Sequence, residues 1–159
     1  MFKKILVSIL ICISFVGCSE ARTVNSNNVS TNTKLVEIYL PNDDLSQWDI
    51  CEKNIDISDL KNVIEVLKDS NKCCIPEETE VISVHIKNKI AYVNLSCEFD
   101  DSQTSSSAAT RVKIYSIVNT LCLNKCFKVE GVKFLIDGKE VETIGPMDAS
   151  LIKLPKLEL

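Results

Sequence analysis

The chain of 159 residues is long enough for one domain of ordinary size after its ends are discounted. Its composition, with 45% hydrophobic and 25% charged residues, is that of a globular protein. The net charge of -4 argues against a nucleic-acid partner, which favours basic patches, and against electrostatic adhesion to anionic lipid. The sequence has no P-loop, dinucleotide fingerprint or EF-hand spacing.

The N-terminus has the layout of an export signal, which we place at residues 1–17. Lys3 and Lys4 form a short basic region, and an apolar run of about a dozen residues follows, too short to span a bilayer. The run ends in Phe15-Val16-Gly17-Cys18, which resembles the lipobox of bacterial lipoproteins, although leucine is usual at the position of Phe15. An ordinary cleaved signal and an uncleaved anchor are the alternatives.

The lipobox resemblance implies that Cys18 is diacylated and becomes the new N-terminus, on the extracytoplasmic side of the cell membrane. Two acyl chains hold a protein stably to a bilayer, whereas one chain binds only marginally. Residues 18–33 are rich in asparagine, serine and threonine, which is typical of a flexible tether. A coil of this length spans roughly 20 Å. We therefore predict a membrane-tethered domain over residues 34–159.

The first part of this domain reads as two extended segments and a helix. Residues 35–40 alternate as a strand, and Pro41-Asn42-Asp43-Asp44 ends it with turn chemistry. Residues 48–55 form a weaker extended segment that carries Cys51. Ser58 is a plausible N-cap for a helix whose apolar stripe is Leu60, Val63, Ile64 and Leu67.

The central stretch predicts a hairpin followed by a second helix. Ile82, Val84 and Ile86 form one face of its first strand, and the second strand alternates from Ala91 to Phe99. From Ser106 to Cys122 the period changes to that of a helix, with a stripe of Ile114, Ile117, Val118 and Leu121.

The last part predicts another hairpin and an irregular tail. Residues 129–136 read as a strand that turns at Asp137-Gly138 and pairs back over residues 139–143. The tail from Gly145 carries two prolines and is expected along a sheet edge. The elements together predict an α+β fold with both helices on one face of a mixed sheet. The strands that flank the second helix should be parallel, since such crossovers are nearly always right-handed.

The order and spacing of four motifs between Leu35 and Asp148 resemble the GerM domain of sporulation and spore germination lipoproteins. These motifs are Val36-Glu37-Ile38-Tyr39-Leu40-Pro41, Ala91-Tyr92-Val93-Asn94-Leu95-Ser96, Ile117-Val118-Asn119-Thr120-Leu121 and Ile136-Asp137-Gly138-Lys139. The resemblance implies a fold like that of ring-building modules, a scaffold role without catalysis or a cofactor, and partners among envelope or sporulation proteins, including self-association. The chain departs from the family in its single copy of the domain and its many cysteines.

Two patterns that look catalytic have simpler interpretations. His85 lies on the strand face opposite Ile82 and Ile86, and no nucleophile motif surrounds it, so a solvated histidine is favoured over a general base. Asp100-Asp101 precedes the second helix, where carboxylates supply turn hydrogen bonds and favourable N-terminal charge. We therefore predict a protein that is not an enzyme.

Six cysteines remain in the predicted domain: Cys51, Cys73, Cys74, Cys97, Cys122 and Cys126. Outside the membrane they can form disulfides, stay free and buried, or bind a metal, although zinc would prefer C-x-x-C pairs, which are missing. The predicted chain path places Cys97 near Cys73 and Cys74, and Cys51 near Cys122 and Cys126, so these are the pairs that disulfides could join.

Two classes of function stay open at this stage. The first is a lipid-anchored scaffold or interaction module in sporulation or germination, as the resemblance implies. The second is a surface lipoprotein that binds a small ligand or a cell-wall fragment. The second class requires a concave pocket with converging polar groups, which no motif in the sequence indicates.

Overall fold

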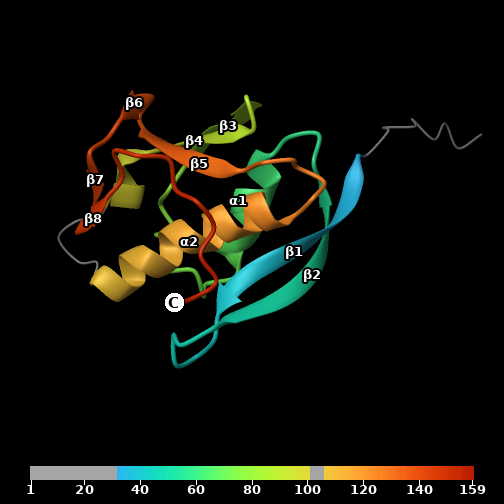
Figure 1. The fold of residues 1–159 in the computed structure, drawn as a ribbon, viewed down its shortest axis with the longest axis horizontal. Helices are drawn as coiled ribbons and strands as arrows, with labels where there is room; N and C mark the ends of the chain where they lie inside the picture. The colour runs from blue at the N-terminus through green and yellow to red at the C-terminus, as the bar shows by residue number, and fades with distance from the viewer. Residues whose placement is uncertain (1–31, 101–105) are drawn as a thin grey trace, which may run out of the picture.

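The computed structural model of the chain describes residues 32–100 and 106–159 (Figure 1). The expected signal sequence, Cys18, nearly all of the tether and Asp101 lie outside the described residues. The elements are β1 (Thr33–Pro41), β2 (Trp48–Asp56), α1 (Lys61–Asp69), β3 (Val81–Lys87), β4 (Ile90–Leu95), the 3-10 helix η1 (Cys97–Asp100), α2 (Ser107–Leu123), β5 (Gly131–Ile136), β6 (Lys139–Glu140), β7 (Thr143–Ile144) and β8 (Met147–Asp148).

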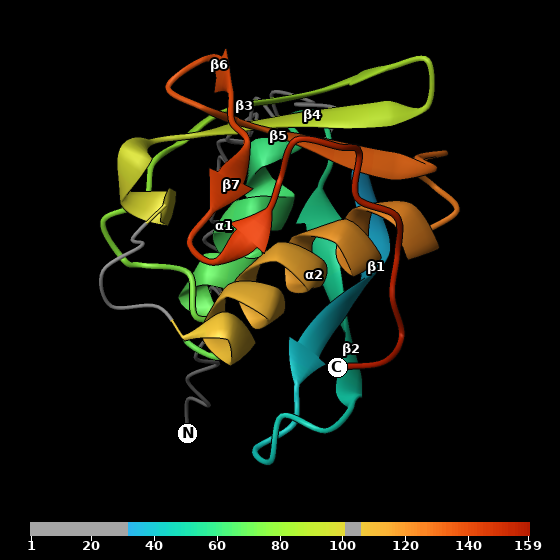
Figure 2. The same cartoon turned by 60° about the vertical axis from the view of Figure 1, so that its left-hand side comes forward.

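The two helices lie between a four-stranded sheet and a separate two-stranded sheet (Figures 1 and 2). The larger sheet has the order β3-β4-β5-β6, and α1 packs against β3 while α2 packs against β5. On the other side of the helices, α2 contacts β1 and α1 contacts β2. The predicted α+β class with helices on one face of a mixed sheet is confirmed for β3 to β6. The first two strands form their own antiparallel hairpin.

The β1–β2 hairpin is regular along its whole length. Its register runs without a break from Thr33 opposite Asp56 to Pro41 opposite Trp48. Val36 and Ile38 are buried against the helices, as the alternation in this segment predicts. The segment from Trp48, which the sequence indicates only weakly because its side chains are mostly polar, is a full strand.

Helix α1 buries Val63, Ile64 and Leu67, as its apolar spacing predicts, but Ser58 is not its N-cap. The helix begins at Lys61, and its N-cap residue makes no capping hydrogen bond from its side chain. The Ser58 hydroxyl instead donates to Asp56 Oδ1 at 2.7 Å. Competition from this nearby carboxylate explains why the capping prediction was wrong.

The β3–β4 hairpin turns through Asn88 and Lys89, both of which have positive φ, as a two-residue hairpin turn requires. Ala91, Val93 and Leu95 of β4 are fully buried. The expectation for β3 was partly wrong, because Ile82 and Ile86 are 39% and 38% exposed. β3 is an edge strand, and its register shifts between Val81 and Ser83, which places Val81 rather than Ile82 in the core.

Strand β4 ends at Leu95 and does not continue to Phe99 as expected. The chain turns at Ser96, whose carbonyl accepts from Phe99 N at 3.1 Å and whose hydroxyl accepts from Glu80 N at 2.9 Å. In the 3-10 helix that follows, Phe99 is still buried and stacks on Phe134 with 5.9 Å between ring centroids. The apolar alternation therefore predicted the burial of Phe99 correctly, but it was wrong about the backbone conformation and about Cys97, which is exposed.

The chain returns through α2 to β5, which pairs with β4 in parallel from Ile90 opposite Gly131 to Leu95 opposite Ile136. This confirms the predicted crossover. The predicted stripe on α2 is fully buried, but so are polar residues on its other sides. These are Thr110, Lys113, Ser116, Asn119 and Thr120. The helix is enclosed because the sheet, the hairpin and the C-terminal segment all pack around it.

The turn at Asp137 and Gly138 has positive φ at both residues, as predicted, and joins β5 to β6, which is shorter than the return strand expected over residues 139–143. The C-terminal segment (residues 149–159), here called the strap, follows the hairpin of β7 and β8. Lys153 forms an isolated antiparallel bridge with Val132, so the strap lies along part of a β5 edge, as expected for the tail. Asn119 of α2 then holds Lys156 through both of its amide atoms, at 2.8 Å each.

Candidate functional site

The residues that resembled a catalytic set are not brought together by the fold. His85 is exposed on the sheet face away from the helices and stacks on Tyr92, with 5.1 Å between ring centroids. Asp100 Oδ1 accepts from the backbone N–H of Gly145 at 2.6 Å. The histidine therefore packs on a surface aromatic, and the carboxylate ties η1 to the loop before β8.

The six cysteines of the described domain are free thiols in the structure. Cys73 is buried, and its Sγ lies 3.6 Å from the Ser70 hydroxyl. Burial raises the pKa of Cys73, and it raises the pKa of Cys122 to about 12. The negative charge of Glu98 raises the pKa of the exposed Cys97. None of these environments favours a thiolate, so none prepares a nucleophile.

Cys51 does not lie where the sequence predicted. It is opposite Ile38 and lines the same groove as Asp69 and Ser70, at the C-terminal end of α1. Cys126 lies in a different groove, beside Leu35 and Glu37. The error arose because β2 extends well beyond Cys51 before the chain turns into α1, so Cys51 is level with the far end of that helix.

The placement of Cys51 argues against its pairing with Cys122 or Cys126. The loop that carries Cys73 and Cys74 does end beside β4, since Glu80 N donates to Ser96 Oγ at 2.9 Å. A bond from Cys97 to one of these two cysteines stays a prediction. In residues 32–100 and 106–159 no three histidine, cysteine or acidic side chains are grouped closely enough to hold a metal ion.

A groove of about 300 Å³ lies on the outer face of the larger sheet, and it is lined by Tyr92, Lys133, Glu140, Ser150, Leu151 and Ile152. The lysine in this groove already has partners, because Lys133 Nζ donates to Ser150 O at 2.5 Å and pairs with Glu140 at 3.2 Å. A ligand would have to displace these contacts.

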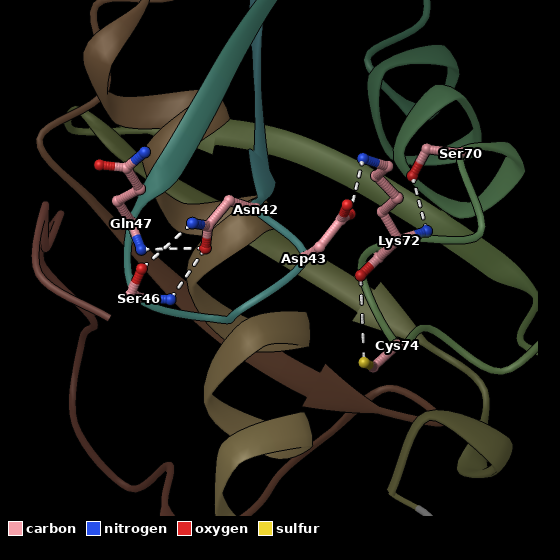
Figure 3. A network of polar contacts seen from close by, with 7 residues as sticks. All are labelled: Asn42, Asp43, Ser46, Gln47, Ser70, Lys72 and Cys74. Carbon is pink, nitrogen blue, oxygen red and sulfur yellow. Dashed lines mark hydrogen bonds and ion pairs between the residues drawn. The ribbon is translucent and has the colours of Figure 1, made fainter.

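The polar contacts in Figure 3 order loops rather than form a pocket. Asn42 Oδ1 accepts from the backbone N–H groups of Ser46 and Gln47 at 2.8 and 3.2 Å, which closes the loop between β1 and β2. Asp43 in this loop pairs with Lys72 after α1 at 3.5 Å (Figure 3). Both charged side chains are well exposed, so the pair contributes little to stability.

Some strand edges of this domain are covered by other segments, and others are open. The outer edge of β1 is closed by α2, because Glu37 N donates to Asn124 Oδ1 at 2.9 Å and Tyr39 N donates to Thr120 Oγ1 at 3.1 Å. The strap covers part of β5. In the described part of the chain no strand pairs with the outer edge of β2 or of β3. Sequence reasoning missed this closure, since no pattern in the sequence indicates that Thr120 and Asn124 accept hydrogen bonds from a distant strand.

The family model described as "Germane: Sporulation and spore germination" matches residues 24–142. The chain belongs to the Germane family. The resemblance to the GerM domain that the sequence motifs indicated is thereby confirmed.

Solved structures show the same fold for the Germane domain at low sequence identity. A candidate lipoprotein from Clostridium perfringens has a TM-score of 0.53 and 20% identity, with 80% of this chain and 93% of that chain covered. The tandem GerMN domains of the sporulation protein GerM from Bacillus subtilis give a TM-score of 0.59 at 20% identity, with 80% of this chain and 46% of that chain covered. The first GerMN domain alone gives 0.51 at 18% identity, with 80% and 97% covered.

The coverage of 46% means that this chain spans about half of the Bacillus tandem, in keeping with one Germane domain. No curated protein matches the chain. Among the described residues no helix is long and apolar enough to cross a membrane.

Proposed function

We propose that this Germane-family protein is a lipid-anchored, non-catalytic interaction module that acts in sporulation or spore germination. The observation that carries the proposal is the family match over residues 24–142. The lipobox-like Phe15-Val16-Gly17-Cys18 supports attachment through Cys18 at the outer side of the cell membrane, and the similar fold of a candidate lipoprotein agrees with it.

The open strand edges of the surface support a protein as the partner. The open edges of β2 and β3 offer unpaired backbone groups, which other proteins can satisfy with a strand of their own. The alternative, binding of a small ligand or cell-wall fragment, would use a surface groove such as the one at Tyr92, whose lysine is already paired with Glu140. We therefore favour contact with envelope or sporulation proteins, with no cofactor involved.

The anchor is tested by metabolic labelling with a fatty acid analogue. The wild-type protein should become labelled and remain with the membrane fraction, and Cys18→Ala should lose the label. Cys12→Ala is the matched control, since Cys12 would be removed with the signal. A Cys18→Ala protein that still labels would show that the lipid is attached elsewhere or that the signal has been misread.

The interaction role is tested by photo-crosslinking in native membranes from sporulating cells. A photoreactive amino acid at the exposed Asn54 of β2 should give adducts with proteins, and one at the exposed Lys139 of β6 serves as the control. Adducts that contain only glycan or a small molecule, and no protein, would favour the ligand-binding alternative.

A further inference from the structure

We propose that copies of this chain associate head to tail, with the open edge of β2 in one copy pairing with the open edge of β3 in the next. The proposal rests on the proposed function as an interaction module and names a second copy of the chain as a partner. Both views place β3 and β2 on opposite sides of the molecule, above and below the helices (Figures 1 and 2). One copy can therefore present both edges at once to different neighbours.

The edge of β2 is long and regular, and specific backbone groups face outward. Glu37 and Tyr39 direct their N–H groups to α2 and away from β2. Their cross-strand partners Glu52 and Ile50 must then direct their own N–H and C=O groups to the opposite, open side of the hairpin. The register of β2 has no bulge over its 9 residues, so its edge lacks the distortion that commonly protects such strands.

The edge of β3 offers a shorter matching surface. The two-residue turn at Asn88 and Lys89 makes Lys87 and Ile90 a hydrogen-bonded pair. The next residue, Ile86, and then Val84 belong to the alternate pairs and direct their backbone groups to the open side. The register shift near Val81 ends this regular portion, which limits the added pairing to the part of β3 nearest the turn.

The charges on the two edges are complementary. β2 carries three acidic side chains and one basic one, which are Asp49, Glu52, Asp56 and Lys53. β3 has no acidic residue and carries His85 and Lys87, and Lys89 in the adjoining turn is paired with Glu130 at 2.6 Å. Pairing two β2 edges would bring an excess of carboxylates together, whereas β2 with β3 brings unlike charges together.

Apolar side chains lie at both edges. Ile50 is 55% exposed on β2, and Ile82 and Ile86 are the exposed isoleucines of β3. A groove of 370 Å³ beside β2, lined in part by Leu40, Cys51 and Val66, could receive a side chain of the added strand. Edge pairing would therefore bury apolar surface as well as satisfy backbone groups, which is the combination that strand addition needs.

The test uses the mature chain with Cys18→Ser, so that no lipid is attached, and two proline variants. Glu52→Pro and Ile86→Pro each remove an outward N–H at an edge position, where proline is tolerated. Analytical ultracentrifugation of the unblocked chain should show a mass that rises with concentration beyond that of a dimer. Each variant alone should stay monomeric, because each retains only one of the two edges. An equimolar mixture should form dimers and nothing larger.

Three results would overturn the proposal. The unblocked chain could stay monomeric throughout, Ile86→Pro could dimerise alone through two β2 edges, or the mixture could fail to dimerise.

Melting curves of the proline variants show whether they are folded. If proline unfolds the strand, charge variants test the same pairing. Glu52→Lys and Lys87→Glu should each weaken association by about tenfold, because each reduces the charge difference between the two edges. Protein adducts in native membranes together with a monomeric purified chain would leave the proposed function intact and refute this pairing.

Discussion

The side chain of Asn124 shows how much a single buried amide can organise in this fold. Its Oδ1 accepts from Glu37 N at 2.9 Å, and its Nδ2 donates to Glu37 O at 2.8 Å and to Thr120 O at 2.7 Å. The residue therefore ends α2 and closes the backbone of β1 at the same time. Both functions depend on donor and acceptor lying at the two ends of one amide group.

Replacing Asn124 by alanine should destabilise the domain by about 2 to 4 kcal/mol, because the Glu37 N–H and C=O would both lose their partner. Urea denaturation of the unlipidated mature chain measures the change. Asn54→Ala, at an exposed site on β2, is the control and should change stability by less than about 0.5 kcal/mol. Equal stability of the two variants would mean that water replaces the Asn124 amide without cost.

The thiol of Cys122 predicts how stability depends on pH. Burial raises its pKa to about 12 in the folded protein, from an ordinary value of 9.0. Below the ordinary value the thiol is protonated in both states, and its contribution to stability is fully present. As the pH rises toward the folded value, the unfolded chain loses the proton first, so stability falls.

We expect Cys122→Ser to reduce this alkaline loss. The urea midpoint of the wild-type protein should fall more steeply between pH 9 and pH 11 than that of the variant, because serine does not titrate there. The comparison uses the slope of the urea midpoint against pH, because a loss of stability from the substitution itself shifts the midpoint equally at every pH. Parallel slopes for the two proteins would show that Cys122 ionises equally in the folded and unfolded states.

At the scale of the elements, the strap explains why α2 is buried on sides that its sequence left polar. Asn119 bonds to Lys156, and Trp48 Nε1 of the hairpin donates to Lys156 O at 3.1 Å. The strap makes these contacts through backbone atoms of Lys156, and four of its apolar side chains remain exposed. These exposed residues are Leu151, Ile152, Leu154 and Leu157. The hydrophobic pattern of the strap therefore gave no guide to its polar contacts with Asn119 and Trp48.

Gly131 marks the tightest approach between the strap and the sheet. A Cβ there would lie 2.5 Å from Ile152 Cγ2 and 3.2 Å from Lys153 O. Gly131→Ala should therefore destabilise the domain by about 1 to 3 kcal/mol through overpacking. Ile152→Ala in the same chain should recover part of that loss, since it removes the nearest atom.

A double-mutant cycle in urea denaturation measures this coupling between Gly131 and Ile152. Leu157→Ala, further along the strap, is the control second site and should give no recovery. Additive losses for Gly131→Ala and Ile152→Ala would show that the strap does not press on β5 in solution.

The position of β3 at the edge of the sheet also determines which of its residues are exposed. Ile82 and Ile86 alternate as core residues would, but β3 ends the sheet, the register shift places Val81 rather than Ile82 in the core, and both isoleucines are exposed. Alternation states which side chains share a face, and it does not state whether another element covers that face. The same two isoleucines then become available for contact with a second molecule.

At the scale of the whole molecule, the folded domain includes residues just before the expected boundary at residue 34. Asn32 O accepts from Ile57 N at 3.1 Å, and the register of the first hairpin starts at Thr33. The tether boundary expected after residue 33 would therefore cut into the hairpin. The domain that folds as a unit should include Asn32.

A chain that starts at Asn32 should melt in one cooperative transition at the same temperature as the unlipidated mature chain. A chain that starts at Leu35 should melt several degrees lower, because it loses the pairs of Thr33 with Asp56 and of Lys34 with Ile55. Calorimetry of the three forms makes the comparison. A lower melting temperature for the chain from Asn32 would assign a structural role to the preceding residues.

Much of the architecture was determined by the sequence itself. The stripe of α1, the turn at Asp137-Gly138, the second helix and its parallel crossover all follow from local spacing and turn chemistry. These signals are local because periodicity and positive φ depend on a residue and its near neighbours. The motifs that resemble the GerM domain belong to the same category, and the family match confirms them.

Only the tertiary structure decided which surfaces are covered. The separation of β1 and β2 from the larger sheet, the enclosure of α2, and the position of Cys51 beside Ser70 all depend on segments far apart in the chain. A sequence pattern gives the direction of a side chain relative to its own backbone. Whether that direction leads to core, solvent or an open strand edge depends on which distant segment packs there.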